Sequence, residues 1–278
     1  MRSGLVICGP DVAYGPLALL SGTFEDKVAK AAALGYDGIE LMVRDPAGLD
    51  WPRIKATLNA HDLGIGQIVT GELFGADGLA LITADEALHR RACTRTESVI
   101  DLAAYLNTKV NVGRLRGRLD WLNMREHAWE KAVELLQPVI AYAKERGVGI
   151  ALEPLNRYES DFILNVDEGL RMIADLGYSN VGLMLDLFHM NIEEASIEDS
   201  LLRAGDRLWH VHIADSNRRY PGAGHTCFEP IFDTLRAMNY DGYVSAELLP
   251  WPDPDTAAQK TIEYLKGALY AEASHVWH

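Results

Sequence analysis

Short apolar runs alternate along this chain with longer segments in which apolar residues recur at helical spacing. Gly, Asn or Asp bounds most of the short runs, which is typical of buried strands, and the longer segments are typical of amphipathic helices. We count eight such pairs. The predicted strands cover residues 4–8, 38–42, 64–69, 109–113, 148–153, 181–186, 208–214 and 243–247. The predicted helices cover residues 24–34, 51–61, 84–106, 122–146, 166–176, 196–204, 228–238 and 257–271.

This regular alternation predicts the fold class. Repeated strand–helix units close most simply as a parallel (β/α)8 TIM barrel with the helices outside, which is an α/β fold. Such a barrel uses about 250 residues as one domain. The 278 residues are therefore predicted to form a single barrel domain over residues 1–278. A doubly wound open sheet is the alternative, but no GxGxxG motif follows the first predicted strand.

Three joints between a predicted helix and the next strand share one chemistry. Gly35, Gly177 and Asn239 each stand just past a helical stretch, and a tyrosine follows each of them. Gly and Asn are the residues that most readily adopt the left-handed conformation that ends a helix. We therefore expect a left-handed residue at all three joints.

Charge and cysteine content narrow the partners and the compartment. The net charge is −14 and the sequence pI is near 5.0, so the field of the protein repels phosphate backbones and anionic membrane surfaces. Neither nucleic acid nor a membrane is an expected partner. No apolar run of ~18 residues suggests a membrane span, and the first apolar run is too short for a signal peptide. The 3 cysteines lie far apart without CxxC spacing, which fits the cytoplasm.

Ionisable residues lie at the ends of four consecutive predicted strands. The C-terminal strand ends of an α/β barrel surround its open mouth, where catalytic groups gather. Three carboxylates within a few ångströms of one another would be forced to take up protons unless a cation neutralised them. Carboxylate and imidazole ligands without cysteine suit Mn²⁺ best, with Mg²⁺, Co²⁺ and Zn²⁺ as further possibilities. The predicted ligands of one divalent ion per chain are Glu153, Asp186, His212 and Glu247.

Two histidines occupy the seventh predicted strand. His210 and His212 are separated by one residue, so both side chains point to the same face of the strand. Only one of them need contact the metal, and we choose His212 because it lies nearer the mouth. His210 is then expected one layer deeper. Glu40, on the second predicted strand, is a further candidate for the pocket.

Three motifs surround these ionisable residues: residues 153–159 (EPLNRYE), 185–194 (LDLFHMNIEE) and 210–218 (HVHIADSNR). Residues 222–225 (GAGH) and the final Glu247 follow in order. The whole set resembles the ketose 3-epimerases, the group with D-tagatose and D-psicose 3-epimerases, in the xylose-isomerase-like TIM-barrel superfamily of sugar phosphate isomerases and epimerases. Within that group, residues 42–46 (MVRDP), 76–79 (ADGL) and 113–118 (GRLRGR) look most like the 5-keto-L-gluconate epimerase branch.

The resemblance implies roles for the residues that match the family's motifs. It implies that the four predicted ligands hold the metal, and that Glu153 and Glu247 also act as the acid/base pair. It implies a small sugar or keto-sugar acid as substrate, and a homodimer or homotetramer as the assembly. The residues that it places against substrate oxygens near the carbonyl are Glu159, His189 and Arg218.

Epimerisation beside a ketone also suits this residue set on chemical grounds. A proton leaves one face of the carbon and returns on the other, so two opposed carboxylates are needed. The carbon acid is very weak until its carbonyl and a neighbouring hydroxyl bind a cation that stabilises the cis-enediolate. We therefore predict an enzyme, a metal-dependent isomerase that epimerises C3 of a ketose or keto-sugar acid.

Two departures from the family pattern leave the sugar open. Residues 248–250 (LLP) stand where many ketose epimerases have Pro-Phe, and residues 224–228 (GHTCF) replace a Gly-Arg-hydrophobic-Pro-Trp run. Arg114, Arg116 and Arg118 could bind a substrate carboxylate through a bidentate fork, or they could form a solvated basic turn. As a substrate-binding residue we choose Arg116, which would face inward if the fourth strand continued that far.

Other functions use similar groups and remain alternatives. An aldose–ketose isomerase passes through the same enediolate, and a lyase or deglycosidase acting on a 3-oxo-glycoside would expel a leaving group after enolisation. An AP-endonuclease-like phosphodiesterase would need more metal-binding histidines and a basic groove. A non-catalytic sugar-binding barrel would not need both carboxylate faces.

Overall fold

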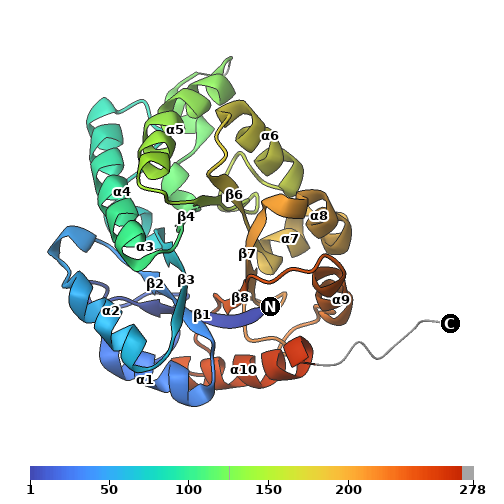
Figure 1. Cartoon of the computed structure of the whole chain (residues 1–278). Coiled ribbons are helices and arrows are strands. Elements are labelled where there is room, and N and C mark those ends of the chain that lie inside the picture. Colours follow the sequence, from blue (N-terminus) through green and yellow to red (C-terminus); the bar gives the residue numbers. More distant parts are fainter. Residues whose placement is uncertain (125, 271–278) are drawn as a thin grey trace.

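Eight parallel strands close into a barrel in the computed structural model, which describes residues 1–124 and 126–270. The strands follow one another around the barrel in chain order, and β8 pairs with β1. Helices surround the strands as an outer ring (Figure 1). This confirms the predicted (β/α)8 architecture. The strands are β1 (Arg2–Cys8), β2 (Gly38–Met42), β3 (Gly64–Val69), β4 (Val110–Val112), β5 (Ile150–Leu152), β6 (Val181–Asp186), β7 (Leu208–Ile213) and β8 (Tyr243–Ala246).

The helices follow the predicted segments closely, with additions after two strands. The short helices α3 and α7 were not predicted, and the predicted helix over 122–146 begins only at Ala128 because a 3₁₀ turn (Leu119–Leu122) precedes it. The last predicted helix reached Ala271, which lies outside the described residues. The helices are α1 (Phe24–Leu34), α2 (Trp51–Ala60), α3 (Gly71–Gly75), α4 (Glu86–Leu106), α5 (Ala128–Glu145), α6 (Val166–Leu176), α7 (Leu187–Glu193), α8 (Ile197–Ala204), α9 (Glu229–Ala237) and α10 (Pro254–Tyr270).

Helix α7 begins without a connecting loop. Asp186 is the last residue of β6, and its side chain also caps α7 by accepting a hydrogen bond of 2.9 Å from the backbone N–H of Phe188. Capping by an aspartate stabilises the first turn of a helix. The strand end and the helix start therefore share one residue, which holds the Asp186 carboxylate at the mouth of the barrel.

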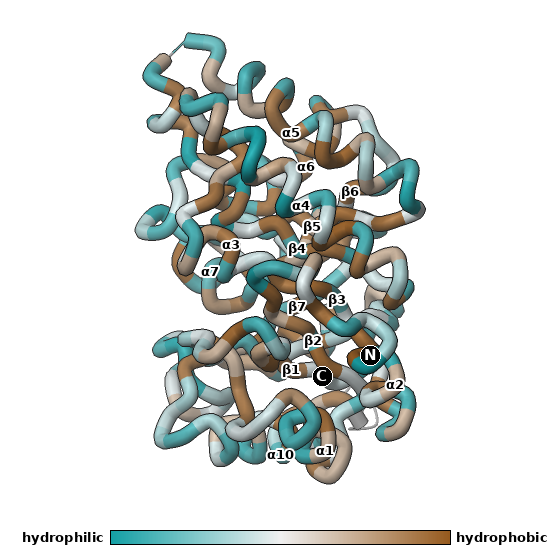
Figure 2. Tube along the Cα trace, turned by 90° about the vertical axis from the view of Figure 1, so that its left-hand side faces the viewer, coloured by the Kyte–Doolittle hydropathy of each residue, from teal (hydrophilic) through white to brown (hydrophobic). Residues whose placement is uncertain are grey.

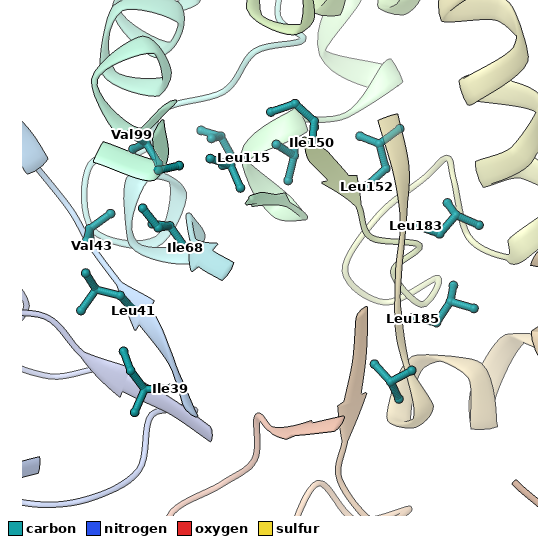
Figure 3. Close-up of a cluster of buried hydrophobic side chains, with 14 of the residues drawn as sticks. Ile39, Leu41, Val43, Ile68, Val99, Leu115, Ile150, Leu152, Leu183 and Leu185 are labelled. Atoms are coloured by element: carbon teal, nitrogen blue, oxygen red, sulfur yellow. The ribbon is translucent and has the colours of Figure 1, made fainter. Parts of the chain in front are cut away.

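Alternating residues on each strand separate the apolar shell from the barrel interior. The side chains labelled in Figure 3 include Ile39 and Leu41 of β2 and Leu183 and Leu185 of β6, and all four are fully buried in the main hydrophobic cluster. Successive strand residues point to opposite faces. The residues between them, such as Glu40, therefore point into the barrel.

The three predicted helix-to-strand joints are confirmed as left-handed. The backbone φ angle is 85° at Gly35, 71° at Gly177 and 55° at Asn239. The glycines have no Cβ to clash in this conformation, and Asn tolerates it better than most residues. The chain can therefore turn sharply from a helix into the next strand.

Hydropathy along the trace follows the same layering. The central strands are mostly hydrophobic, whereas the surrounding helices alternate between hydrophobic and hydrophilic turns (Figure 2). A helix that packs on a barrel needs an apolar stripe on one side only. Among the helices of residues 1–124 and 126–270, none is long and apolar enough to cross a membrane.

Candidate active site and metal centre

The four ionisable strand-end residues come together at the mouth of the barrel. One ligand atom from each of Glu153, Asp186, His212 and Glu247 lies within 4.8 Å of all the others. Asp186 pairs with His212 in the register of β6 and β7, which places these two side by side. Glu153 directly follows β5, and Glu247 directly follows β8. The predicted set is thus a single compact cluster.

Two buried atoms of this cluster are poorly satisfied: Nδ1 of His212 has no hydrogen-bond partner among the described residues, and Oδ2 of Asp186 has only its ion pair with Arg218. A buried polar atom without a partner is destabilising, so such atoms are commonly ligands of an ion or hydrogen-bonded to water. The donor set of three carboxylates and one imidazole is typical of sites for hard or borderline divalent cations. The residues present therefore fit a divalent metal ion.

The two glutamates differ sharply in electrostatic environment. Burial raises the pKa of Glu153 to about 8, and the nearby Glu247 carboxylate adds to the rise. Burial also disfavours the charge on Glu247, but His212 and the Arg218 guanidinium outweigh it and hold the pKa of Glu247 at about 2. At neutral pH the metal-free site therefore contains one protonated and one ionised glutamate. Such a divergence is characteristic of acid/base pairs.

Arg218 lies inside the cluster, as expected for a residue near the substrate. Its Nη1 is 2.7 Å from Oδ2 of Asp186, and its Nη2 donates a hydrogen bond to Glu247. The guanidinium also lies over the ring of Phe188, 4.6 Å from its centroid. Since Arg218 is buried, its positive charge balances part of the negative charge of the carboxylates.

His189 faces the same carboxylates from helix α7. Its Nε2 is 3.6 Å from Oε1 of Glu153 and 3.7 Å from Oδ2 of Asp186. The side-chain amide of Asn156 lies 2.7 Å from Nδ1 of His189. Burial lowers the pKa of His189, which favours a neutral imidazole. When the Asn156 amide donates to Nδ1, the ring proton is on Nε2 and points toward the carboxylates.

Glu159 lies at the rim and not within the cluster. It is exposed, and its Oε1 accepts a hydrogen bond of 3.3 Å from the Asn156 amide. Asn156 therefore joins Glu159 to His189. Of the predicted substrate-binding residues, the structure places Arg218 and His189 against the predicted metal ligands and leaves Glu159 accessible at the entrance.

Arg116 lies where the sequence interpretation did not expect it. The fourth strand ends at Val112 and residues 114–116 form a 3₁₀ turn, so strand alternation does not extend to Arg116. Its side chain is fully buried, and Nη1 donates hydrogen bonds to the backbone carbonyls of Glu153 (2.7 Å) and Gly113 (3.0 Å). Nη2 donates to Ser160 Oγ and to the carbonyls of Phe162 and Ile163.

This placement speaks against a substrate carboxylate on Arg116, because protein oxygens already occupy both terminal nitrogens of the guanidinium. Arg116 instead fastens the segment after β4 to the segment after β5, which positions Glu153.

Replacing Arg116 by methionine is accordingly expected to destabilise the fold. The variant would leave buried carbonyls without donors, and we expect the free energy of unfolding to fall by roughly 3 kcal/mol. Urea unfolding measures this. The matched control is Arg114→Met, which we expect to change stability by less than about 1 kcal/mol because the half-buried Arg114 side chain makes no hydrogen bond or ion pair among the described residues and only lies over the ring of Phe74. An Arg116→Met protein of unchanged stability, with a higher KM for keto-sugar acids alone, would restore the carboxylate assignment.

Two polar residues of the strands were missed as site residues. Asn111 of β4 donates a hydrogen bond of 3.1 Å to Oε2 of Glu153, and Gln67 of β3 contacts Glu40 deep in the barrel. Both are buried amides within otherwise apolar runs. A single polar residue at an inward position of a core strand is the signal that could have identified them.

Comparisons with known proteins agree with this architecture. The sequence model of a family described as xylose isomerase-like TIM barrel matches residues 28–268. L-ribulose 3-epimerase of Methylomonas sp. (strain DH-1) is 31% identical over 261 residues, which cover 86% of this chain and 89% of that protein. A 3-dehydro-D-guloside 4-epimerase of Escherichia coli (strain K12) is 38% identical over 125 residues, which cover 45% of this chain and 48% of that protein. The solved structure of an L-ribulose 3-epimerase is 26% identical, with a TM-score of 0.79 and 99% of both chains covered.

Proposed function

The chain belongs to the xylose isomerase-like TIM barrel family, as its motifs predicted, and we propose that it is a divalent-metal-dependent epimerase acting at C3 of a ketose or keto-sugar acid. The observation that supports this most directly is the pair of buried glutamates, Glu153 and Glu247, whose carboxylates lie within 4.8 Å of each other and whose pKa values are displaced in opposite directions. Epimerisation needs one group that holds a proton and one that is free to accept it.

The two glutamates then act from two sides of the reacting carbon. One carboxylate accepts the proton from C3 and the other delivers a proton to the opposite face, and the opposite pKa shifts of the metal-free site favour Glu247 as acceptor and Glu153 as donor. For the reverse reaction the two exchange roles. Glu153 is aligned by the Asn111 amide on its side chain and by Arg116 on its backbone carbonyl. Both contacts limit the movement of the carboxylate, which helps because proton transfer requires close and constant geometry.

The cation that we propose, with Mn²⁺ favoured, would be held by Glu153, Asp186, His212 and Glu247, and it would supply positive charge to the oxygens of the enediolate. Two other side chains act on the same oxygens. Arg218 is a permanent cation in the buried cluster, and His189 presents a ring N–H without requiring a net charge. In a site with little water, hydrogen-bond donors lower the activation free energy most when they already point at the atoms where negative charge develops. Glu159, at the rim, would bind a more distant hydroxyl.

Arg114 is the better candidate for a substrate carboxylate. It follows Gly113, where an added Cβ would overlap the Glu153 carboxylate, so this turn lies directly against the site. The Arg114 guanidinium lies 5.5 Å from the ring centroid of Phe74. Arg118, by contrast, is paired with Asp120 at 3.1 Å. We therefore propose that Arg114 binds a substrate carboxylate, in place of Arg116, which was chosen from the sequence.

A second substrate class is favoured by a specific relative. The E. coli protein that is 38% identical over 125 residues is named for epimerisation of a 3-dehydro-guloside, a sugar that still bears its aglycone. The same base could then epimerise a 3-oxo-glycoside beside its carbonyl, or expel the aglycone after enolisation. An aldose–ketose isomerase would use the enediolate in a different register.

One screen tests these options together. The protein is loaded with Mn²⁺ and incubated in deuterated water with neutral ketoses, keto-gluconates and 3-oxo-glycosides, and products are analysed by NMR. We expect a C3 epimer with deuterium at C3. Exchange at C1 or C2 with aldose formation would identify an isomerase, and free aglycone would identify a lyase. Neither exchange nor product from any of the three classes would contradict the proposal.

A further inference from the structure

A layer of polar side chains fills the barrel interior beneath the predicted metal ligands. Glu40 of β2, Gln67 of β3, His210 of β7 and Ser245 of β8 are all completely buried. Branched apolar residues usually fill this position in such barrels. Burying polar groups is costly unless every one is hydrogen-bonded. An interior layer of this composition therefore calls for a functional explanation.

Glu40 is the centre of this layer. Its Oε1 lies 2.6 Å from Nε2 of His210, and its Oε2 lies 2.9 Å from Nε2 of His212. The Gln67 amide donates a third hydrogen bond, of 2.8 Å, to Oε2. A single carboxylate thus holds both imidazoles of β7 from the opposite side of the barrel.

Two glycines make room for this arrangement. A Cβ at Gly66 would lie 3.0 Å from Cε1 of His210, and a Cβ at Gly4 would overlap the hydroxyl of Ser245, which lies 3.2 Å from Nε2 of His210. A side chain at Gly66 would therefore displace the His210 ring, and one at Gly4 would displace Ser245. The interior is therefore shaped around His210 and its neighbour Ser245.

The contact with Glu40 determines how His212 presents its ring. An ionised carboxylate can only accept hydrogen bonds, so the 2.9 Å contact with Glu40 favours a proton on Nε2 of His212. The other ring nitrogen, Nδ1, lies 3.4 Å from Oε2 of Glu247 and has no hydrogen-bond partner among the described residues. A metal ion at the cluster would take the lone pair of Nδ1 in place of a proton. Carboxylates bonded to the far nitrogen of a ligating histidine commonly orient the ring and strengthen the ligand.

We propose that Glu40 is a positioning residue that fixes His212 in the Nε2-protonated tautomer and thereby sets the metal affinity of the site. The inference rests on the proposed metal-dependent function. Glu40, His210 and His212 are also close enough to hold a second ion as a group. We reject that use because direct hydrogen bonds link the three side chains and the Gln67 amide nitrogen lies 3.3 Å from Nε2 of His212.

The first experiment measures Mn²⁺ binding by calorimetry in the wild type, Glu40→Gln and Ser245→Ala. We expect one ion per wild-type chain and roughly 10- to 100-fold weaker binding by Glu40→Gln. Ser245→Ala loses a hydrogen bond with His210 but keeps the two hydrogen bonds that Glu40 accepts from the histidines. Its Mn²⁺ affinity should therefore stay unchanged. Metal-free melting curves separate a general loss of stability from a change in affinity.

Each outcome bears on a different claim. Equal Mn²⁺ affinity in Glu40→Gln and wild type would overturn the positioning role while leaving the proposed function intact. Two ions per wild-type chain would favour the second site that we reject. No Mn²⁺ binding by the wild type would overturn both the positioning role and the metal-dependent function.

A second measurement avoids substitution altogether, in case Glu40→Gln does not fold. Nitrogen NMR of the ¹⁵N-histidine-labelled wild type, loaded with diamagnetic Zn²⁺, reports which ring nitrogen of His212 bears the proton. We expect a proton on Nε2 and the metal on Nδ1. The opposite assignment would refute the role of Glu40 even if affinity had fallen in the variant.

Discussion

Glu247→Gln is expected to remove C3 proton exchange, lowering turnover roughly 10³-fold or more at saturating Mn²⁺. The pKa of Glu247 is held at about 2, against the effect of its burial, by His212 and Arg218, so the carboxylate is ionised and able to accept a proton across the neutral range. The amide of glutamine has nearly the same shape but cannot accept that proton. Mass spectrometry of deuterium incorporated at C3 measures the loss directly.

Glu153→Gln is the other half of this prediction, because inversion requires proton transfer on both faces. We expect a loss of similar size, since no other side chain could transfer a proton from the position of Glu153. The matched control is Glu193→Gln, which alters a glutamate with a 6% exposed side chain that pairs with Arg157 outside the cluster. Circular dichroism confirms that each variant folds. Normal deuterium incorporation by either site variant would remove that glutamate from the acid/base pair.

Removing the divalent ion is expected to have an effect of comparable size on activity. After chelation and dialysis we expect turnover to fall roughly 10³-fold and to return on addition of Mn²⁺, because the enediolate charge would then face uncompensated carboxylates. Saturating Mn²⁺ should also raise Tm by roughly 5–10 °C, since a ligand at about 100 times its Kd adds about 2.7 kcal/mol.

Asp186→Asn serves as the control for this Tm shift. Its fully buried carboxylate is one of the proposed ligands, paired only with Arg218 through Oδ2, and the amide replaces it with a neutral group. We expect the variant to show little or no stabilisation by Mn²⁺. Full activity in a dialysed, metal-free wild type would contradict metal dependence, whatever the melting curves show.

Local sequence pattern predicted the elements well where strands are long and bounded by helix-ending residues. The strands over 38–42, 64–69 and 181–186 match the structure residue for residue. The fourth and fifth strands were predicted too long by one or two residues at each end, since the structure limits them to residues 110–112 and 150–152. The short helix α7 was missed because its cap, Asp186, is also the last residue of β6.

The candidate metal cluster could be predicted because a barrel converts chain order into position. Once four consecutive strands end in Glu153, Asp186, His212 and Glu247, closure of the barrel brings those ends to one rim. Periodicity and strand ends contain that information, so the sequence alone determined the fold class and the set of ionisable residues at the mouth.

Only the tertiary structure decided what the remaining polar residues do. Glu40 meets His210 across the barrel, 170 residues away along the chain, and no local spacing reports such a contact. Arg116 appeared to face the substrate, but burial and five hydrogen bonds to protein oxygens place it in the framework. Local periodicity depends on neighbouring residues, whereas the protonation and orientation of a buried side chain depend on partners that only the folded chain brings within 3 Å.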